Sequence, residues 1–393
     1  MVTKVDLLVV GGGPAGLSTA LHVRHAAPHL AMAVLEKATY PREKICAGGV
    51  GGRAFKLLDK LGVTVDCPKV HLDAIALRFG GETVVAREPG LGAVVRRAEF
   101  DHALAQQVIA RGIEVRDGCG VETIEIDDER DHVRVTTDTG DVYEARAIVG
   151  ADGVGGIVRR QAGFPRGELR AQAVELDTEA APGDLPRDTI LFSFDARDLN
   201  GYAWDFPTVV DGQPLVCRGA YMIRNLGADD ARARLRAYLT SRGLDPTRYR
   251  YKQFAERGYE PGAEIARPRV LLVGEAAGID IATGEGIGQA IEYGAIAGPY
   301  LARAFARDNL RFSDWRHTVE RHHLGWQFTI RHWCYRIFYS ERRPTVEKIL
   351  LQLPAMFRVG MQDFAGLPFS KLTLARGAGQ FLGAYARHKM RAE

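Results

Sequence analysis

The chain has 393 residues, a formal net charge of +3 and 46% hydrophobic residues, the composition of an ordinary globular protein. Its five cysteines are an odd, scattered set without a C-x-x-C pair, so we expect neither a disulfide framework nor a metal site. No run reaches the roughly eighteen apolar residues of a membrane span, and no signal peptide precedes the first strand, so we expect a cytoplasmic protein.

The first predicted elements are a strand over 5–10, a glycine-rich turn and a helix over 17–25. Gly11, Gly13 and Gly16 have the G-x-G-x-x-G spacing of a dinucleotide-binding turn. The first glycine permits the turn, the second lets a pyrophosphate approach the backbone, and the third lets the helix pack close to the strand. The N-terminus of the helix then presents free N–H groups and a positive dipole end to the phosphates.

A second buried strand, over 31–35, ends at Glu36, twenty residues after Gly16. A carboxylate there accepts hydrogen bonds from both ribose hydroxyls and repels a 2′-phosphate, which indicates FAD or NAD rather than NADP. A glycine-rich turn that binds nothing is the alternative, but strand, helix and acid in register disfavour it. No Gly-Lys-Ser/Thr closes the loop, which excludes a P-loop.

The segment 41–49 has a turn-forming proline and paired glycines, which let backbone lie against a flat ligand. Cys46 within it is either a small buried filler or a residue that the fold brings to the cofactor. A helix is expected over 53–61, short strands over 74–95, and a further helix that runs to about Arg111. Arg97 stands at the start of that helix, where its guanidinium could reach the cofactor.

Alternating segments with polar turns then predict a small antiparallel meander inserted in the parallel fold. These segments are 113–115, 121–126, 133–137 and 142–143. Another buried strand, over 147–151, ends in Asp152-Gly153.

A Pro/Gly-rich stretch over 163–186 indicates a boundary, and a β-rich section with one helix follows it. The parallel pattern returns with a strand over 270–273 that ends in Gly274-Glu275. A loop then leads to Gly284-Glu285-Gly286-Ile287-Gly288, where a long helix begins. This is the second helix with glycines at its N-terminus, and such an N-terminus is suited to bind a polar, electron-rich group.

The C-terminal region is basic: from Pro299 to the end there are sixteen Lys/Arg and seven Asp/Glu, a net charge of +9 against −6 for the rest. This suggests an anionic ligand or surface, although a solvated helix face explains charge alone as well. A helical stripe is formed by Trp326, Ile330, Trp333 and Ile337, and such a stripe usually belongs to the core.

The predicted fold is α/β, a Rossmann-like FAD-binding domain with an inserted β-meander, a β-rich substrate domain and a helical C-terminal region. The predicted FAD-binding domain is discontinuous, over 1–160 and 265–305. The substrate-binding domain is expected over 161–264 and the helical region over 306–393.

Three fingerprints in one order resemble the FAD-binding fold shared by aromatic hydroxylases, flavin-dependent halogenases and geranylgeranyl reductases. They are G-x-G-x-x-G with Glu36, then Asp152-Gly153, then Gly274-Glu275 before a glycine-rich helix. The resemblance spans about residues 5–300 and implies Glu36 on the ribose, Arg97 near the phosphate–ribityl side, and the 274–288 segment at the ribityl chain and flavin ring. The residues expected to bind FAD are Gly11, Gly13, Pro14, Ala15, Gly16, Glu36, Lys37, Lys44, Cys46, Ala47, Gly48, Arg97, Asp152, Gly274, Glu275, Gly284, Gly286, Ile287 and Gly288.

One position departs from the family pattern, which usually has Gly-Asp where this chain has Gly274-Glu275. Because glutamate is one methylene longer, its contact with the ribityl hydroxyls is expected to be shifted or water-mediated. The carboxylate chemistry is kept, so FAD remains the expected cofactor.

Two segments favour the reductases within this superfamily. The run from Tyr202 through Trp204 and Phe206 to Pro207 resembles their Y-x-W-x-F-P motif, whereas halogenases carry W-x-W-x-I-P. The 41–49 run is similar to their K-x-C-G-G segment, with Ala47 in place of one glycine. Aromatic side chains on alternate strand positions point one way and could line an apolar tunnel for substrate. The alternative is a core strand whose aromatics fill space.

The resemblance implies an FAD-dependent oxidoreductase that reduces isolated C=C bonds of a polyprenyl lipid or prenylquinone, with hydride from reduced flavin. It implies Cys46 as the catalytic neighbour of the flavin, and a thiol near its ordinary pKa is mostly protonated at neutral pH and can donate. The electron donor would be NADPH, a reductase or a ferredoxin. Gly377-Ala378-Gly379 comes nearest to a second dinucleotide motif, but no apolar strand precedes it.

Two other classes stay open at this point. One is a monooxygenase or halogenase that acts through a flavin hydroperoxide, and the other is a flavoprotein that binds lipid or relays electrons. The expected partners are an isoprenoid substrate and an anionic membrane surface, with no nucleic acid.

Overall fold

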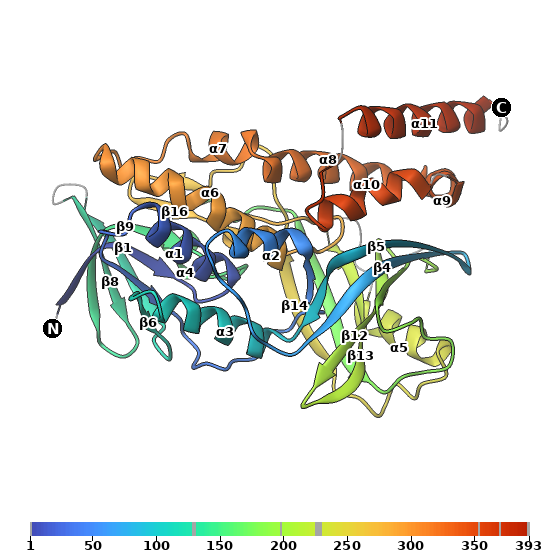
Figure 1. Ribbon diagram of the computed structural model, residues 1–393, viewed down its shortest axis with the longest axis horizontal. Helices are drawn as coiled ribbons and strands as arrows, with labels where there is room; N and C mark the ends of the chain where they lie inside the picture. Colours follow the sequence, from blue (N-terminus) through green and yellow to red (C-terminus); the bar gives the residue numbers. More distant parts are fainter. Residues whose placement is uncertain are drawn as a thin grey trace.

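The structure, a computed structural model, describes residues 2–127, 131–196, 199–224, 230–352, 354–368 and 371–390. Two eight-stranded sheets lie side by side, and helices of the C-terminal third run across them (Figure 1). The predicted α/β class, with a Rossmann-like sheet, a β-rich part and C-terminal helices, is therefore confirmed.

The first sheet is the mainly parallel one that carries the glycine-rich turn. Its strands are β1 (Val2–Val10), β2 (Met32–Leu35), β6 (Glu114–Arg116), β7 (Val121–Asp127), β8 (His132–Thr137), β9 (Val142–Gly150), β15 (Ala266–Arg267) and β16 (Val270–Leu272). Strand β1 lies between β2 and β9 and is parallel to both, with Leu8 opposite Ala33 and Ile148. Helices cover this centre, so the apolar run of β1 is buried from Leu7 onward.

The predicted meander is smaller than expected and differs in its members. Strands β7, β8 and β9 do pair in antiparallel fashion, but β6 pairs with β2 in parallel and extends the main sheet. The segments 142–143 and 147–150 also form one strand, because Glu144 and Arg146 between them point away from the core in strict alternation. Strand β9 therefore belongs to the meander and to the parallel sheet at once.

Two long helices pack on each other above the glycine-rich turn. The helices over this sheet are α1 (Pro14–Ala26), α3 (Arg97–Ile109), α4 (Ile157–Gln161) and α6 (Ile287–Ala306), with a short 3-10 turn η2 (Gly274–Ala276) before α6. A Cβ on Gly294 of α6 would lie 2.4 Å from Ser18 Oγ, and one on Gly298 would lie 2.4 Å from His22 Cβ. Glycines in α6 thus allow α1 and α6 to pack closely, so that the N-termini of two helices far apart in the sequence lie in the same region of the structure.

The second sheet is mostly antiparallel, in the order β14-β10-β13-β12-β11-β4-β5-β3, and helix α5 (Ala231–Ser241) covers part of it. Its strands are β3 (Gly49–Gly51), β4 (Lys69–Phe79), β5 (Glu82–Val95), β10 (Arg170–Thr178), β11 (Thr189–Ser193), β12 (Gly201–Val210), β13 (Gln213–Ile223) and β14 (Lys252–Arg257). The short strands predicted over 74–95 are instead two long strands of one hairpin.

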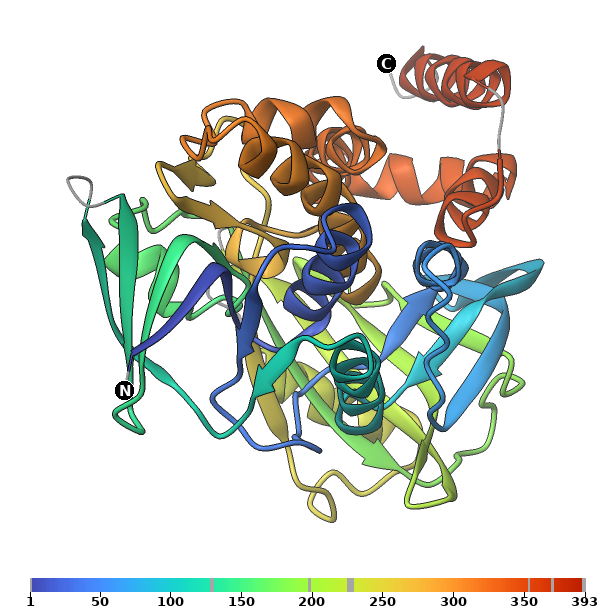
Figure 2. The same cartoon turned by 60° about the vertical axis from the view of Figure 1, so that its left-hand side comes forward.

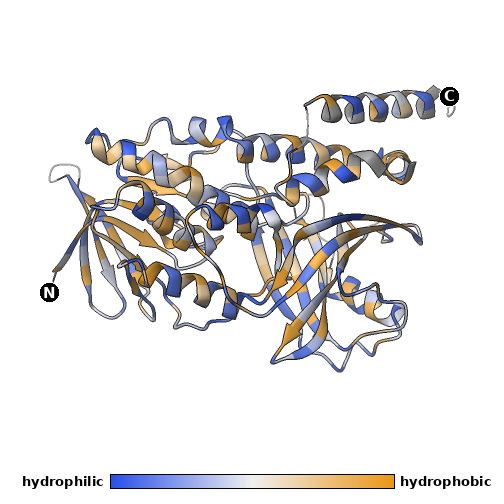
Figure 3. Ribbon diagram, viewed as in Figure 1, coloured by the Kyte–Doolittle hydropathy of each residue, from blue (hydrophilic) through white to orange (hydrophobic). Residues whose placement is uncertain are grey.

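This sheet takes three strands from the first hundred residues, because β4 pairs in parallel with β11. The two sheets are therefore not divided at residue 160, where the predicted domain bound lies. The assignment of 161–264 to substrate binding stays a prediction. Strands of both sheets carry hydrophobic stretches, drawn in orange (Figure 3).

Helices α2 (Gly52–Asp59), α7 (Trp315–Arg321), α8 (His323–Phe338), α9 (Arg343–Gln352), α10 (Pro354–Phe364) and α11 (Lys371–Met390) complete the fold. Helix α11 lies outermost in both views (Figures 1 and 2). Over the described ranges, no helix is both long and apolar enough to cross a bilayer.

The prediction that the α8 stripe belongs to the core is wrong. Trp326, Trp333 and Ile337 are 37%, 58% and 37% exposed. Helix α8 buries another face, which includes Phe328 and Tyr335. The stripe thus lies outward because both sides of α8 carry apolar residues and periodicity alone cannot tell them apart.

Candidate active site

A polar cavity of about 640 Å³ opens where the glycine-rich turn, the end of β2 and the end of β9 meet. Fourteen of the residues predicted to bind FAD line it, although they come from distant parts of the chain. These are Gly11, Gly13, Pro14, Ala15, Glu36, Lys37, Lys44, Cys46, Arg97, Asp152, Glu275, Gly284, Gly286 and Ile287. The two predicted glycine-opened helices therefore face one cavity.

The glycines of the first turn differ in what surrounds them. Gly11 has φ +109°, and a Cβ there would lie 2.4 Å from the backbone oxygen of Ala151. Both the backbone conformation and this contact therefore exclude a side chain. A Cβ on Gly16 would lie 1.9 Å from the oxygen of Gly11, which shows close helix–strand packing. Around Gly13 there is free space, with the nearest atoms at 3.7 Å in the guanidinium groups of Arg42 and Arg97.

Glu36 is held at the end of β2 by backbone donors. The Gly12 N–H donates to Oε2 at 3.0 Å, and the Ala38 N–H donates to Oε1 at 3.1 Å. Arg42 Nη2 lies 3.2 Å from Oε2, so a guanidinium group also faces the carboxylate. Sequence reasoning did not predict Arg42, whose charge is shared with the buried Asp101 at 3.1 Å.

Arg97 and Asp152 bring opposite charges to the cavity. Arg97 is fixed by the Asp101 carboxylate, with N···O distances of 2.8 and 2.6 Å. Asp152 accepts from the Val158 N–H at 2.9 Å through Oδ2, while its buried Oδ1 has no partner among the described residues. Burial raises the pKa of Asp152 to about 6.

The second glycine segment closes the cavity from α6. Gly274 has φ +59° and packs on Ala15, with 2.5 Å between its would-be Cβ and the alanine Cβ. Glu275, the residue that departs from the family pattern, accepts from the Arg257 N–H at 3.4 Å. Burial raises the pKa of Glu275. Gly16, Gly274 and Gly288 thus lie outside the cavity lining, where they allow close packing.

These residues fit an FAD. Free backbone beside Gly13 and two guanidinium groups suit a pyrophosphate, and the Glu36 carboxylate suits a ribose. Asp152, whose buried Oδ1 has no hydrogen-bond partner among the described residues, lies in the same lining and could accept from a bound molecule. Ribityl or ribose hydroxyls are suitable hydrogen-bond donors.

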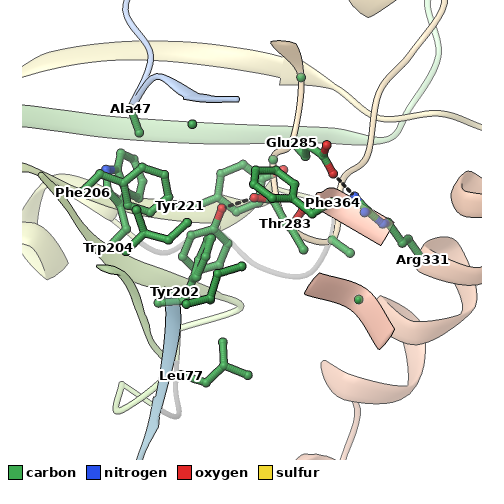
Figure 4. Close-up of a pocket in the computed structure, with 18 of the residues that line it drawn as sticks. Ala47, Leu77, Tyr202, Trp204, Phe206, Tyr221, Thr283, Glu285, Arg331 and Phe364 are labelled. Carbon is green, nitrogen blue, oxygen red and sulfur yellow. Dashed lines mark hydrogen bonds and ion pairs between the residues drawn. The ribbon is translucent and has the colours of Figure 1, made fainter. Parts of the chain in front are cut away.

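An apolar cavity of about 400 Å³ lies next to the polar one, between the second sheet and the C-terminal helices. Tyr202, Trp204 and Phe206, on alternate positions of β12, lie together at this cavity (Figure 4), as the sequence predicts. Tyr202 and Trp204 have ring centroids 6.2 Å apart, and Phe206 packs edge-on to Phe192 at 5.4 Å. The Tyr202 hydroxyl donates to the Thr283 carbonyl, which ties the aromatic wall to the second glycine segment.

The C-terminal helices close the far side of this cavity. Residues of α8, α9 and α10 in the lining include Tyr335, Phe338, Leu350 and Phe364. In Figure 4 Arg331 of α8 points to Glu285, and its Nη1 lies 2.6 Å from Glu285 Oε2 and 2.8 Å from Asp280 Oδ2. None of the residues of α8, α9 and α10 was predicted to belong to the site, because an amphipathic helix gives no sign of which element it will cover.

Six residues line both cavities and form their boundary: Cys46, Phe254, Glu256, Gly284, Gly286 and Ile287. Cys46 is held by two backbone contacts, since its N–H donates to Glu175 Oε1 at 3.0 Å and its Sγ accepts from the Gly48 N–H at 3.4 Å. Burial raises the pKa of the thiol, although Arg97 opposes this. Ala47 and Gly48, which were predicted to contact FAD, line the apolar cavity.

Comparisons with known proteins agree with this geometry. A family described as FAD binding domain matches residues 4–194. A menaquinone reductase of Mycobacterium tuberculosis is 29% identical over 325 residues, 77% of this chain and 78% of its own length. A digeranylgeranylglycerophospholipid reductase of Methanosphaera stadtmanae is 25% identical over 332 residues, 78% of this chain and 81% of its own.

Solved structures share the fold over nearly the whole chain. A geranylgeranyl bacteriochlorophyll reductase-like protein of Thermoplasma acidophilum superposes with a TM-score of 0.78 at 16% identity, covering 99% of both chains. The flavin-dependent brominase Bmp2 superposes with a TM-score of 0.67 at 17% identity, covering 99% of this chain and 100% of its own. With these matches and the residues that line the polar cavity, the chain is an FAD-dependent oxidoreductase that matches an FAD-binding domain over residues 4–194, is similar in sequence to the two named reductases and shares its fold with the geranylgeranyl bacteriochlorophyll reductase-like protein.

Proposed function

We propose that this oxidoreductase reduces isolated C=C bonds of a polyprenyl lipid or a prenylquinone. The observation that carries the proposal is the junction of the two cavities: an aromatic-lined apolar chamber meets a glycine-lined polar one across six shared residues. A prenyl chain has no polar atoms to pair, so it suits a chamber lined by aromatic and aliphatic side chains. The two named relatives are reductases of a prenylquinone and a prenyl lipid.

The bound cofactor in its reduced form would supply the hydride equivalent for this reaction. The chain's own residues bind, orient and exclude water. Tyr202, Trp204 and Phe206 would hold the prenyl chain, while the C-terminal helices keep solvent from the far side. The Cys46 thiol, protonated at neutral pH because burial raises its pKa, would hold a proton at the boundary.

The electron donor and the route of a lipid substrate belong to this proposal as well. The first glycine-rich turn would be occupied by FAD, so a nicotinamide nucleotide would have to bind without a Rossmann domain of its own. NADPH, a reductase or a ferredoxin would then reduce the cofactor. The outward stripe of α8 includes Trp333 with Arg336 stacked 5.5 Å from its ring. Together with the basic C-terminal third, this surface would make a peripheral contact with an anionic membrane.

Anaerobic turnover tests the proposal. The FAD-loaded protein is reduced with dithionite and mixed with geranylgeraniol or menaquinone-4, and the product is analysed by mass spectrometry. Menaquinone products are first reoxidised from the quinol to the quinone in air, so that only a reduced C=C bond changes the mass. The proposal expects a product heavier by one hydrogen molecule, and an unchanged lipid contradicts it. Cys46→Ser with FAD retained and turnover unchanged would remove the thiol from the mechanism.

An oxygen-dependent hydroxylase or halogenase is the second candidate, because the brominase shares this fold over the full chain. Oxygen separates the two candidates. A reductase turns over without oxygen, whereas a hydroxylase or halogenase yields product only when air is admitted. Oxygen-dependent product with no anaerobic turnover would favour the second candidate.

A further inference from the structure

Glu256 is a buried carboxyl at the boundary between the two cavities. It lies on β14 opposite Ala171 of β10, on the face that also carries Phe254. The residue is 8% exposed, and it lines the polar and the apolar cavity at once. Among the six boundary residues, all within the described ranges, Cys46 and Glu256 are the two whose side chains can donate a proton.

One oxygen of this carboxyl has no hydrogen-bond partner among the residues that the structure describes. This oxygen, Glu256 Oε2, is buried. It faces the second glycine segment, since a Cβ on Gly284 would lie 3.3 Å from it. A buried oxygen without a partner is costly unless a bound molecule completes its surroundings. The position therefore points to a ligand, and the ligand lies where the cavities meet.

The neighbouring tyrosines do not compete as proton donors. The Tyr202 hydroxyl donates to the Thr283 carbonyl, and the Tyr221 hydroxyl donates to the Ile281 carbonyl at 3.0 Å. Burial raises the pKa of both phenols far above the ordinary value. Both phenols thus keep their protons and donate to carbonyls of the loop, and the Tyr221 hydroxyl also acts on Glu256.

The charges around Glu256 disfavour its ionised form. The titratable and charged groups that act on it come from the 44–46 segment, β12, β13 and the loop before α6: Lys44, Cys46, Tyr202, Tyr221, Glu275 and Asp280. Burial and then the charge of Glu275 raise the pKa of Glu256 well above its ordinary value, and the Tyr221 hydroxyl and then Lys44 oppose them. The surroundings therefore favour the protonated form of the carboxyl.

A carboxylic acid and a thiol differ as donors to an alkene. An isolated C=C bond is a very weak base, so its protonation needs the stronger acid. The ordinary pKa of a glutamic acid is about four units below that of a cysteine thiol, and burial raises both here. The ordinary acidity of a carboxylic acid and the unpartnered Oε2 at the junction of the cavities favour Glu256 over Cys46 as the proton source.

We propose that Glu256 is the acid that protonates the substrate double bond, an inference that rests on the proposed function. One C=C π bond breaks. The Glu256 proton forms a C–H bond at one carbon, and the hydride equivalent of the reduced cofactor forms a C–H bond at the other. Glu256 is left as a carboxylate and takes a proton from water, while the cofactor is oxidised by two electrons.

The test compares Glu256→Gln and Glu256→Asp with wild type and with Glu125→Gln, the same change at an exposed position of β7 that lines neither cavity. Each protein is loaded with FAD, and FAD affinity is measured by fluorescence titration. Dithionite-reduced protein is then mixed anaerobically with geranylgeraniol across a pH series. A second readout, independent of turnover, is the infrared carbonyl band of a protonated carboxylic acid, recorded at neutral pH without substrate.

The proposal expects Glu256→Gln to keep FAD affinity and to lose about 100-fold or more of the turnover rate. Wild-type turnover falls as pH rises through the pKa of the acid, and Glu256→Gln lacks this alkaline limb, whereas Glu256→Asp and Glu125→Gln keep it. The protonated-acid band weakens in Glu256→Gln alone.

Two results would overturn the inference while the proposed function stands. One is wild-type turnover and an unchanged alkaline limb in Glu256→Gln, and the other is an infrared band unaffected by that substitution. If the wild type reduces neither geranylgeraniol nor menaquinone-4, the proposed function and this inference both fall. Loss of FAD affinity in Glu256→Gln would also count against the inference, because it assigns Glu256 to binding.

Discussion

Gly13 and Gly16 belong to the same turn, but alanine at 13 is expected to weaken FAD binding, whereas alanine at 16 is expected to destabilise the fold. Gly13 has extended backbone, φ −84° and ψ −177°, and its would-be Cβ meets nothing closer than 3.7 Å. The would-be Cβ of Gly16 lies 1.9 Å from the Gly11 carbonyl oxygen. The alanine therefore fits the folded chain at 13 and does not fit at 16.

The magnitudes follow from these distances. Gly13→Ala leaves the FAD-free fold stable, or raises its stability by about 0.4–1 kcal/mol, because the unfolded chain loses conformational freedom. The new methyl group enters the polar cavity, and the loss of one charge-assisted contact to a pyrophosphate costs about 1.5–3 kcal/mol, roughly 10- to 150-fold in FAD affinity. Gly16→Ala must separate α1 from β1 and costs about 1–3 kcal/mol or more in stability.

Thermal melting of the FAD-free proteins and fluorescence titration with FAD measure the two effects separately. Gly379→Ala serves as the control, since nothing in the described part of the chain lies within 4 Å of its would-be Cβ in α11. Wild-type FAD affinity in Gly13→Ala would refute the placement of the pyrophosphate beside that residue. A wild-type melting temperature in Gly16→Ala would refute the close helix–strand packing.

Three further predictions concern buried polar groups. Tyr202→Phe removes the hydrogen bond to the Thr283 carbonyl, so we expect melting to show a stability loss of about 1 kcal/mol, and no loss would show that the bond is immaterial. Burial and then the Asp177 charge raise the pKa of Glu175 to about 7, so the folded FAD-free chain loses about 3 kcal/mol as pH rises from 4.5 to about 7. In Glu175→Gln the amide oxygen can still accept from the Cys46 N–H, so urea denaturation at several pH values should show no such loss of stability. A loss equal to that of the wild type would contradict the prediction. The carboxylates of Asp363 and Glu292 raise the pKa of His323 to about 9, so stabilisation by the imidazolium is full below pH 6.5 and is lost as pH rises through 9. In His323→Gln the loss of stability between pH 6.5 and 9, measured by urea denaturation, should be smaller than in the wild type by about 1–3 kcal/mol, a range that allows for the partly exposed ring. An equally steep loss in the variant would refute the role given to His323.

Much of the cofactor side was predictable from the sequence because its signals are local. The spacing of Gly11, Gly13 and Gly16 and the acid at the end of β2 specify a turn whose geometry depends on a few neighbouring residues. The alternate aromatics of β12 were likewise readable, since a strand places positions 202, 204 and 206 on one face.

The substrate side was less predictable because its signals are non-local. Strand β14 reads Lys-Gln-Phe-Ala-Glu-Arg and carries no apolar alternation, and Glu256 is buried by the Gly284 loop and by Tyr221, which are remote in the sequence. Arg331 looks like one more charge on an amphipathic helix until α8 packs on the loop with Asp280 and Glu285. The outward α8 stripe was misread for the same reason.

The central claim is that the polar and apolar cavities are two halves of one active site that meet at Cys46 and Glu256. A crystal structure of the FAD-loaded protein with a bound geranylgeranyl ether tests it most directly. The account predicts the flavin ring beside the six boundary residues, with the prenyl chain running past Trp204 toward α8. A flavin ring remote from Glu256, or a prenyl chain bound outside the aromatic chamber, would contradict it.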